Sequence, residues 1–302
     1  MTQNKIEIPA VNKIPKTATS TSITWKDLNV GPFPNQCTMT ISLEDIKRWC
    51  SLYDDDVSLY KDFAPHYIGY YCGQNIFTPF RDIAAGLVYL NVEFFKDIPH
   101  SVPLTVTGKV IEKSTRKGRG YVDWITEIKD QDTIVQRNTR SWYFASLTEE
   151  EIKKFPLKKS GISIPEKNIN NISSKLKILL NQERMNQFEG PGEINGHTNV
   201  DLAKKQGNPG PLAQGAFGFG LISRLLAKDY GARFTNGGQL SLKFVRPVWA
   251  GEEITASYSY DNKQSIRVSV EKDNKEEVIV GSAKLAQKKN PAYYLYVLKL
   301  FY

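Results

Sequence analysis

The sequence predicts an α+β protein in which one unit, a helix packed on an antiparallel sheet, occurs twice along the chain. Between residues 212 and 226, apolar side chains recur with the spacing of one helical face. The segments before and after it alternate polar and apolar residues and are rich in β-branched and aromatic side chains, which is typical of strands. Similar residues also recur at two fixed offsets, which indicates an internal repeat.

The first copy is expected over residues 25–146, after an N-terminal arm at 1–24. A strand at 36–41 leads into a helix, because Ser42 with Asp45 three residues later forms a capping box. Between residues 63 and 85, prolines and glycines interrupt an aromatic run, which predicts a broken or shortened helix. Four strands are then expected, at 88–95, 102–113, 120–129 and 133–144.

The second copy is expected over residues 176–302, after a charged linker with two prolines at 147–175. Asn181 stands where Ser42 stood, an offset of 139, and Phe244 stands where Phe94 stood, an offset of 150. The long helix of this copy is expected at about 212–228. Strands are predicted at 177–180, 253–260, 265–271 and 277–286.

Composition limits the class of protein. Hydrophobic residues make up 40% and charged residues 24% of the chain, as in ordinary globular domains. No apolar run is long enough to predict a membrane span, and no secretory signal is recognisable. Three cysteines and three histidines match neither a disulfide framework nor a zinc site. We therefore expect a cytoplasmic protein without a metal.

The net charge of +8 has two interpretations. It can simply reflect a lysine-rich surface without a specific function. Alternatively, it can attract an anionic substrate, such as the phosphates of coenzyme A or an acidic carrier protein. The basic residues are dispersed and no nucleic-acid-binding motif is present, so nucleic acid is not an expected partner.

A polar segment precedes the long helix of the second copy. It reads Glu193-Ile-Asn195-Gly-His197-Thr198, with Ala203 six residues after the histidine. Farther on come Ala213-Gln-Gly215 and Phe244-Val-Arg-Pro-Val248. In order and spacing these residues resemble the MaoC-like hydratases and dehydratases. The turn Lys117-Gly-Arg-Gly-Tyr121 is similar to one in the first copies of their two-unit members.

The resemblance implies a double hotdog, in which two tandem antiparallel sheets each wrap a helix. It also implies an R-specific enoyl-thioester hydratase or 3-hydroxyacyl-thioester dehydratase of fatty acid metabolism. The substrate would be a thioester of coenzyme A or acyl carrier protein, and no cofactor would be needed. Two double hotdogs can further associate as a homodimer.

The resemblance assigns the catalytic histidine to His197. The family pattern Asp-x-Asn-Pro-x-His is one residue shorter here, with Glu193 in place of the aspartate. The longer glutamate side chain can compensate for the missing residue and still reach the site, or it can point to solvent. Asn195 would orient the histidine or the water, although Asn-Gly is also an ordinary turn. Gly215 and Ala216 would donate backbone N–H groups to the thioester oxygen, since a helix N-terminus favours negative charge.

The first copy has no histidine at the corresponding place, where Asp55 and Tyr60 stand instead. We expect it to be non-catalytic and to line the acyl slot. Two other functions stay open. A hotdog acyl-CoA thioesterase would use a carboxylate to activate water against the carbonyl carbon. A non-catalytic protein would bind the thioester without converting it.

Overall fold

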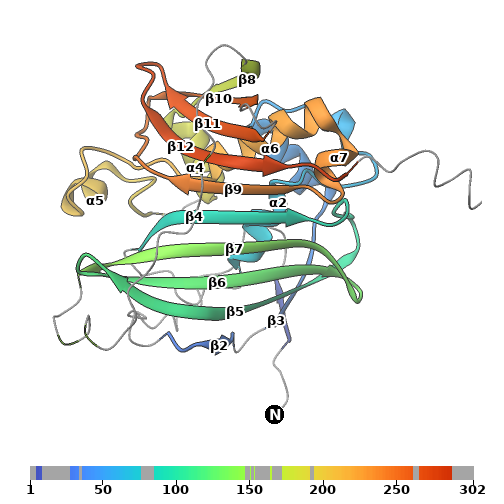
Figure 1. Ribbon diagram of the computed structural model, residues 1–302, viewed down its shortest axis with the longest axis horizontal. Helices are drawn as coiled ribbons and strands as arrows, with labels where there is room; N and C mark the ends of the chain where they lie inside the picture. The colour runs from blue at the N-terminus through green and yellow to red at the C-terminus, as the bar shows by residue number, and fades with distance from the viewer. Residues whose placement is uncertain are drawn as a thin grey trace, which may run out of the picture.

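The computed structural model of this 302-residue chain describes residues 5–8, 28–33, 36–75, 85–146, 150, 153, 164, 172–190, 194–260 and 265–287. The strands of this part form a single twisted sheet of twelve. Figure 1 shows this sheet from its outer face, with the longer helices behind it. One face of the sheet is therefore covered by helices.

The first unit begins with the capped helix that the sequence predicts. The Ser42 hydroxyl accepts the Asp45 N–H at 3.0 Å, and the Asp45 carboxylate accepts the Ser42 N–H at 2.8 Å. Each terminal N–H thus gains a partner. The elements of this unit are β3 (Gln36–Thr40), α1 (Leu43–Leu52), η1 (Val57–Leu59), α2 (Ile68–Asn75), β4 (Ala85–Phe94), β5 (Pro103–Arg116), β6 (Arg119–Asp130) and β7 (Thr133–Ser146).

The second unit begins in the same way. Asn181 caps its first helix by accepting the Arg184 N–H at 2.8 Å, as the offset of 139 from Ser42 predicts. The elements of this unit are β8 (Ile172–Leu179), α4 (Gln182–Glu189), α5 (Val200–Lys205), α6 (Ala216–Tyr230), α7 (Ala232–Thr235), β9 (Gln239–Phe244), β10 (Glu253–Tyr260), β11 (Ile266–Lys272) and β12 (Glu277–Lys284).

The sheet contains the same strand order twice. Counted outward from the centre it runs β4-β7-β6-β5-β3 on one side and β9-β12-β11-β10-β8 on the other. The central strands β4 and β9 are antiparallel, and Asn91 faces Ser241 with a hydrogen bond between their side chains. These two residues are themselves related by the offset of 150, so the repeat is arranged about a twofold axis at this pair.

The α+β hotdog fold is therefore confirmed. The boundaries 25–146, 147–175 and 176–302 stay predictions, because most of the expected linker and the tail after residue 287 lie outside the described residues. Two short strands add to the edge of the first unit. They are β1 (Lys5–Ile8), which runs parallel to β3 from within the expected arm, and β2 (Gly31–Pro32), which pairs with β5.

Helix α6 is the centre of the second unit's core. Ten of its fifteen residues are buried. It starts at Ala216, not at residue 212 as the apolar spacing predicted, because the backbone before it is engaged elsewhere. The Leu212 N–H bonds the Gly196 carbonyl and the Ala213 N–H bonds the Val248 carbonyl. The segment is thus extended until Gly215.

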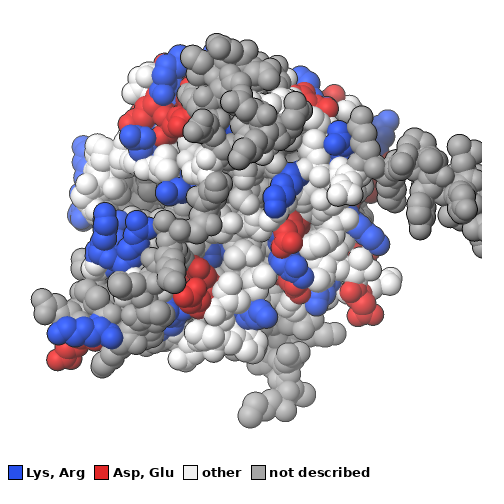
Figure 2. Space-filling view, viewed as in Figure 1, with Lys and Arg blue, Asp and Glu red and all other residues white. Residues whose placement is uncertain are grey.

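Charges of both signs are interspersed over the face in Figure 2. Several of the basic side chains are ion-paired, for example Arg137 with Glu127 at 2.8 Å. No described helix is long and apolar enough to cross a membrane.

Candidate active site

The candidate site is built where α4 ends and α6 begins. Met185, Phe188 and Glu189 share one face of α4, since residues three and four apart are neighbours on a helix. Met185 and Phe188 are buried in the core, which brings Glu189 to the inner side of the helix end. Gly190 then ends the helix with a φ of 102°, a conformation that favours glycine.

The next described residues form a tight turn around Asn195. Its side-chain oxygen accepts the His197 N–H at 2.8 Å, and its N–H bonds the Thr198 hydroxyl at 3.0 Å. The turn reading of Asn-Gly is therefore correct. The same asparagine also reaches the helix end, because its Nδ2 donates to Glu189 Oε2 at 2.8 Å. Asn195 thus fixes the position of His197 relative to α4.

The His197 ring is held from one side. Its Nδ1 lies 2.5 Å from the Leu212 carbonyl oxygen, which can only accept a hydrogen bond. Nδ1 therefore carries the proton, and in the neutral ring Nε2 keeps its lone pair. Gln182 Nε2 holds the backbone by donating to the His197 carbonyl at 2.9 Å. A half-buried imidazole with a fixed tautomer and an unprotonated Nε2 is suited to act as a general base.

Glu189 connects this turn to the start of α6. Its Oε1 accepts a hydrogen bond from Gln214 Nε2 at 2.7 Å, while Oε2 accepts the one from Asn195. Gln214 directly precedes Gly215, so one carboxylate holds both the histidine turn and the helix start. Glu189 was not among the predicted site residues. Its place on the buried face of α4 was the available signal, because a carboxylate there needs hydrogen-bond donors.

Gly215 and Ala216 form the N-terminus of α6. Gly215 is the N-cap residue and has no side-chain cap. Among the described residues, no acceptor meets the N–H of either one, as expected for the first turn of a helix. A Cβ at Gly215 would lie 2.8 Å from the Phe244 ring. The glycine therefore also serves close packing of the helix on β9, and the two roles are compatible.

Glu193 lies outside the described residues, so its assignment stays a prediction. Asp55, from the first unit, is engaged elsewhere. Its carboxylate accepts hydrogen bonds from Arg224 Nε at 2.8 Å, Tyr60 at 2.6 Å and Tyr67 at 3.0 Å. Because Arg224 lies more than two turns beyond Gly215 on α6, Asp55 supports the helix at a distance from its N-terminus.

The first unit also contacts the start of α6 directly. Tyr53 is buried, and its hydroxyl donates to the Ala216 carbonyl at 2.9 Å. Burial raises the pKa of this phenol, so it stays protonated and remains a donor. Gly220 makes room for the Tyr53 ring, since a Cβ there would lie 2.3 Å from it.

Comparisons with known proteins agree with this architecture. Residues 171–281 match the family model described as the MaoC like domain. A MaoC-like dehydratase from Phytophthora capsici has a TM-score of 0.69 at 16% identity, over 87% of this chain and 97% of its own. The peroxisomal multifunctional enzyme type 2 of Drosophila melanogaster has a TM-score of 0.65 at 13% identity, over 83% of this chain and 48% of its own.

A third similar structure is HtdX of Mycobacterium tuberculosis, with a TM-score of 0.61 at 14% identity, over 82% of this chain and 97% of its own. No curated protein sequence matches the chain. At these identities the structural likeness establishes the fold alone. Together with the family match, it shows that residues 171–281 of this chain are similar to the MaoC like domain in sequence and in fold.

Proposed function

We propose that this protein is a hydro-lyase that adds water across the double bond of a trans-2-enoyl thioester, with R stereochemistry, and catalyses the reverse dehydration. The observation that carries the proposal is the single carboxylate, Glu189, that holds the histidine turn and the start of α6 together. A base and an oxyanion-binding helix terminus thereby meet at one place. The MaoC-like match supports the class of reaction.

In the hydration step, His197 Nε2 accepts a proton from a bound water as the water oxygen forms a bond to C3 of the acyl chain. The π electrons of the C2–C3 bond move toward the thioester oxygen, which becomes an enolate. The N–H groups of Gly215 and Ala216 stabilise this charge, with help from the helix dipole. The enolate then collapses and C2 takes up the proton held at His197 Nε2, which completes the addition and returns the histidine to its neutral form.

Glu193 is our proposed carboxylate partner of His197 on this water. We assign a different task to Glu189, because both of its oxygens already accept amide hydrogen bonds. It is a positioning residue that holds Asn195 and Gln214 in fixed positions relative to each other. Hydration is not a redox reaction, so we propose no redox cofactor, and the proposed steps use the chain's own residues without a metal.

We further propose coenzyme A or acyl carrier protein as the carrier of the substrate, a cytoplasmic location and a homodimer of double hotdogs. The test of the function is an ultraviolet assay of purified protein with trans-2-enoyl-CoA substrates from crotonyl to dodecenoyl. Loss of the enoyl absorbance without release of free thiol supports the hydro-lyase. Release of free thiol would identify a thioesterase instead. Binding of the panel without conversion of any member would place the protein in the non-catalytic class.

A further inference from the structure

The interior of the first unit contains a row of polar side chains that the proposed reaction does not use. Gln136, Asn138 and Arg140 alternate along β7, so they point to the same face of the sheet, toward α2. All three are fully buried. Polar groups of this kind are costly to bury unless every one has a hydrogen-bond partner.

The corresponding strand of the second unit, β12, has no such row at the matching positions. On β7, Gln136, Asn138 and Arg140 pair with Phe94, Val92 and Leu90 of β4. At the corresponding positions of β12, the residues that pair with Phe244, Leu242 and Leu240 of β9 are Ile279, Gly281 and Ala283. The repeated fold is therefore compatible with an apolar or small row at this place. The polar row is specific to the first unit.

Arg140 is a buried cation for which the described residues supply no compensating anion. Nη1 donates to the Thr126 hydroxyl at 2.9 Å and Nη2 to the Tyr70 carbonyl at 2.5 Å. The guanidinium lies between the rings of Tyr70 and Trp124, at 4.5 and 4.6 Å from their centroids. Within the described residues, Nε has no acceptor and no carboxylate pairs with this side chain.

Burial lowers the pKa of Arg140 to about 10, so the side chain stays charged at neutral pH. A guanidinium has five N–H donors, and only two of them have oxygen acceptors here. The remaining donors include Nε and suit a planar group with two oxygens, because a carboxylate can accept two parallel hydrogen bonds from one edge of an arginine.

Gln136 is the second side chain of the row with a polar atom that lacks a hydrogen-bond partner among the described residues. Its Nε2 donates to Asn138 Oδ1 at 2.9 Å, and Asn138 Nδ2 donates to the Gly69 carbonyl at 3.3 Å. Its own Oε1 is buried and accepts no hydrogen bond in the described structure. A Cβ at Gly69 would lie 2.3 Å from this oxygen, so α2 closes directly over the row. Gln136 Oε1 can accept a hydroxyl or a water that accompanies a ligand.

The row lies on the side of the first unit that faces α6. The Tyr70 ring, which stacks on Arg140, also contacts the Phe219 ring at a centroid distance of 5.5 Å. Phe219 is one turn after Gly215, where the proposed function places the thioester oxygen. A group at Arg140 is therefore separated from the reacting end of a substrate by the two aromatic layers of Phe219 and Tyr70.

We propose that Arg140 and Gln136 form a binding site for a carboxylate at the far end of the acyl chain, so that the preferred ligands are thioesters of dicarboxylic acids. The assignment of this carboxylate to the acyl substrate rests on the proposed function. An anion at this place supplies the charge and the oxygens that Arg140 lacks. An alkyl chain that ends in a methyl group would leave the charge of Arg140 without a counterion and its remaining N–H groups without acceptors.

The test compares equilibrium binding of saturated thioesters, which cannot be hydrated, by isothermal titration calorimetry. Pairs of equal length from hexanoyl to hexadecanoyl are used, one ending in a methyl group and one in a carboxylate. We expect the carboxylate form to bind at least about tenfold more tightly at one or more lengths, in keeping with a charge-assisted pair. Free dicarboxylates and monocarboxylates of the same lengths are measured in parallel.

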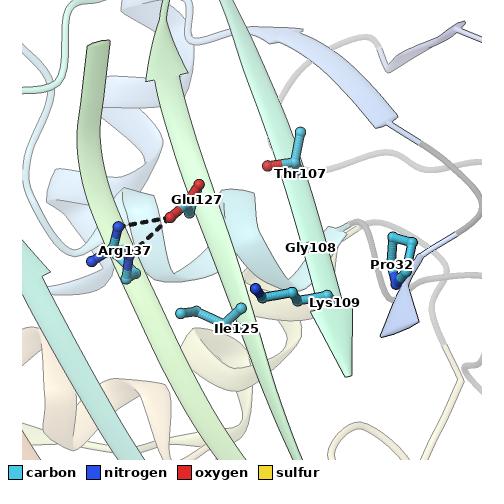
Figure 3. A pocket seen from close by; sticks show the side chains of 7 residues that line it. All are labelled: Pro32, Thr107, Gly108, Lys109, Ile125, Glu127 and Arg137. Carbon is cyan, nitrogen blue, oxygen red and sulfur yellow. Dashed lines mark hydrogen bonds and ion pairs between the residues drawn. The ribbon is translucent and has the colours of Figure 1, made fainter. Parts of the chain in front are cut away.

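Arg140→Met should abolish the preference and leave the unliganded melting temperature unchanged or higher, because a buried unpaired charge is replaced by an apolar side chain of similar volume. Arg137→Met is the matched control. Arg137 lies on the same strand but faces the outer hollow in Figure 3, where it is paired with Glu127. This control should keep the preference.

Gln136→Leu is the second variant, and it should reduce the preference even if Arg140→Met does not fold. Equal binding of both chain types at every length would overturn the inference, as would an undiminished preference in both variants. Equal binding of an ω-hydroxyl chain and an ω-carboxylate chain would overturn the carboxylate assignment. A preference for dicarboxylates without turnover of any enoyl thioester would leave this site standing and remove the proposed reaction.

Discussion

Glu189 is the last residue of α4, and each of its carboxylate oxygens accepts one amide N–H, from Asn195 and from Gln214. A glutamine at this place keeps the size but has only one oxygen, so one of the two donors would face another donor. Glu189→Gln should lower kcat by about tenfold to a hundredfold through misplacement of His197 or Gly215. The free energy of unfolding should fall by about 1–2 kcal/mol.

Steady-state kinetics on an enoyl-CoA substrate would measure this effect, with kcat expected to change more than KM. Glu183→Gln is the control, because Glu183 lies on the same helix with an exposed side chain. If the two variants had equal activity, Glu189 would have no positioning role.

His197 is the second residue whose replacement is informative. His197→Ala should reduce kcat by about two to four orders of magnitude, the usual range for a positioned acid or base. Thermal stability should change little, because the ring is only half-buried and, among the described residues, its one hydrogen bond is with the Leu212 carbonyl. His100→Ala removes a half-buried histidine of the first unit that hydrogen-bonds the Lys61 carbonyl, and it serves as the control. Full activity of the His197→Ala variant would rule out the proposed mechanism.

Glu193→Gln tests the predicted carboxylate partner of the water without changing the size of the side chain. Loss of turnover in a folded variant would support a Glu193–His197 pair. Normal turnover of Glu193→Gln would show that Glu193 is not the partner of His197 on the water, and steady-state kinetic assays of the variant beside the wild type separate these outcomes.

At the scale of elements, α6 receives a side chain from the other unit. A Cβ at Gly220 would lie 2.3 Å from the Tyr53 ring, which is itself fully buried. Alanine normally favours a helix by about 0.5–1 kcal/mol over glycine. Overpacking costs about 1–3 kcal/mol and should dominate here. We therefore expect Gly220→Ala to destabilise the protein in denaturant titrations.

The smaller side chain of Tyr53→Leu should relieve this clash. In that background Gly220→Ala should cost less than in the wild type, and the difference is the coupling energy of the pair. Equal costs in both backgrounds would show that Tyr53 and Gly220 do not interact energetically.

At the scale of the whole molecule, the two units share one sheet. Strands β4 and β9 pair at the centre, and Arg184 of α4 donates to the Leu52 carbonyl at 2.6 Å. Neither unit can unfold without exposing the edge of the other. Thermal unfolding should be one cooperative transition, with calorimetric and van't Hoff enthalpies that agree. Two resolved transitions in a calorimetric scan would contradict this expectation.

The net charge of +8 leads to a prediction about binding. Coenzyme A carries several phosphates, and attraction to exposed charges is screened over about 10 Å at 0.1 M salt. KM for an enoyl-CoA should rise between low and high salt. A substrate on a neutral short thiol carrier provides the control. A KM that is independent of salt would mean that the charge belongs to the surface in general, where both signs are interspersed (Figure 2).

Local signals in the sequence were sufficient for the elements and for their repetition. Ser42 and Asn181 cap their helices as predicted, because a cap depends on residues within one turn. The strands that were predicted lie within a few residues of their expected positions, since alternation of side chains is also a local property, but the central strand β9 was not among them. The start of α6 was the exception. The residues just before it, Leu212 and Ala213, are held extended by hydrogen bonds to Gly196 and Val248, which lie in other parts of the chain.

The sequence by itself determined the α+β class, the repeat, and the resemblance that points to His197, Asn195 and Gly215. Only the tertiary structure decided which groups surround them. It placed Glu189 between the histidine turn and α6, and it engaged Asp55 with Arg224. The reason is physical. A helix or strand follows from neighbours a few residues apart, whereas a hydrogen bond across the core depends on how separate elements pack, which no local spacing encodes.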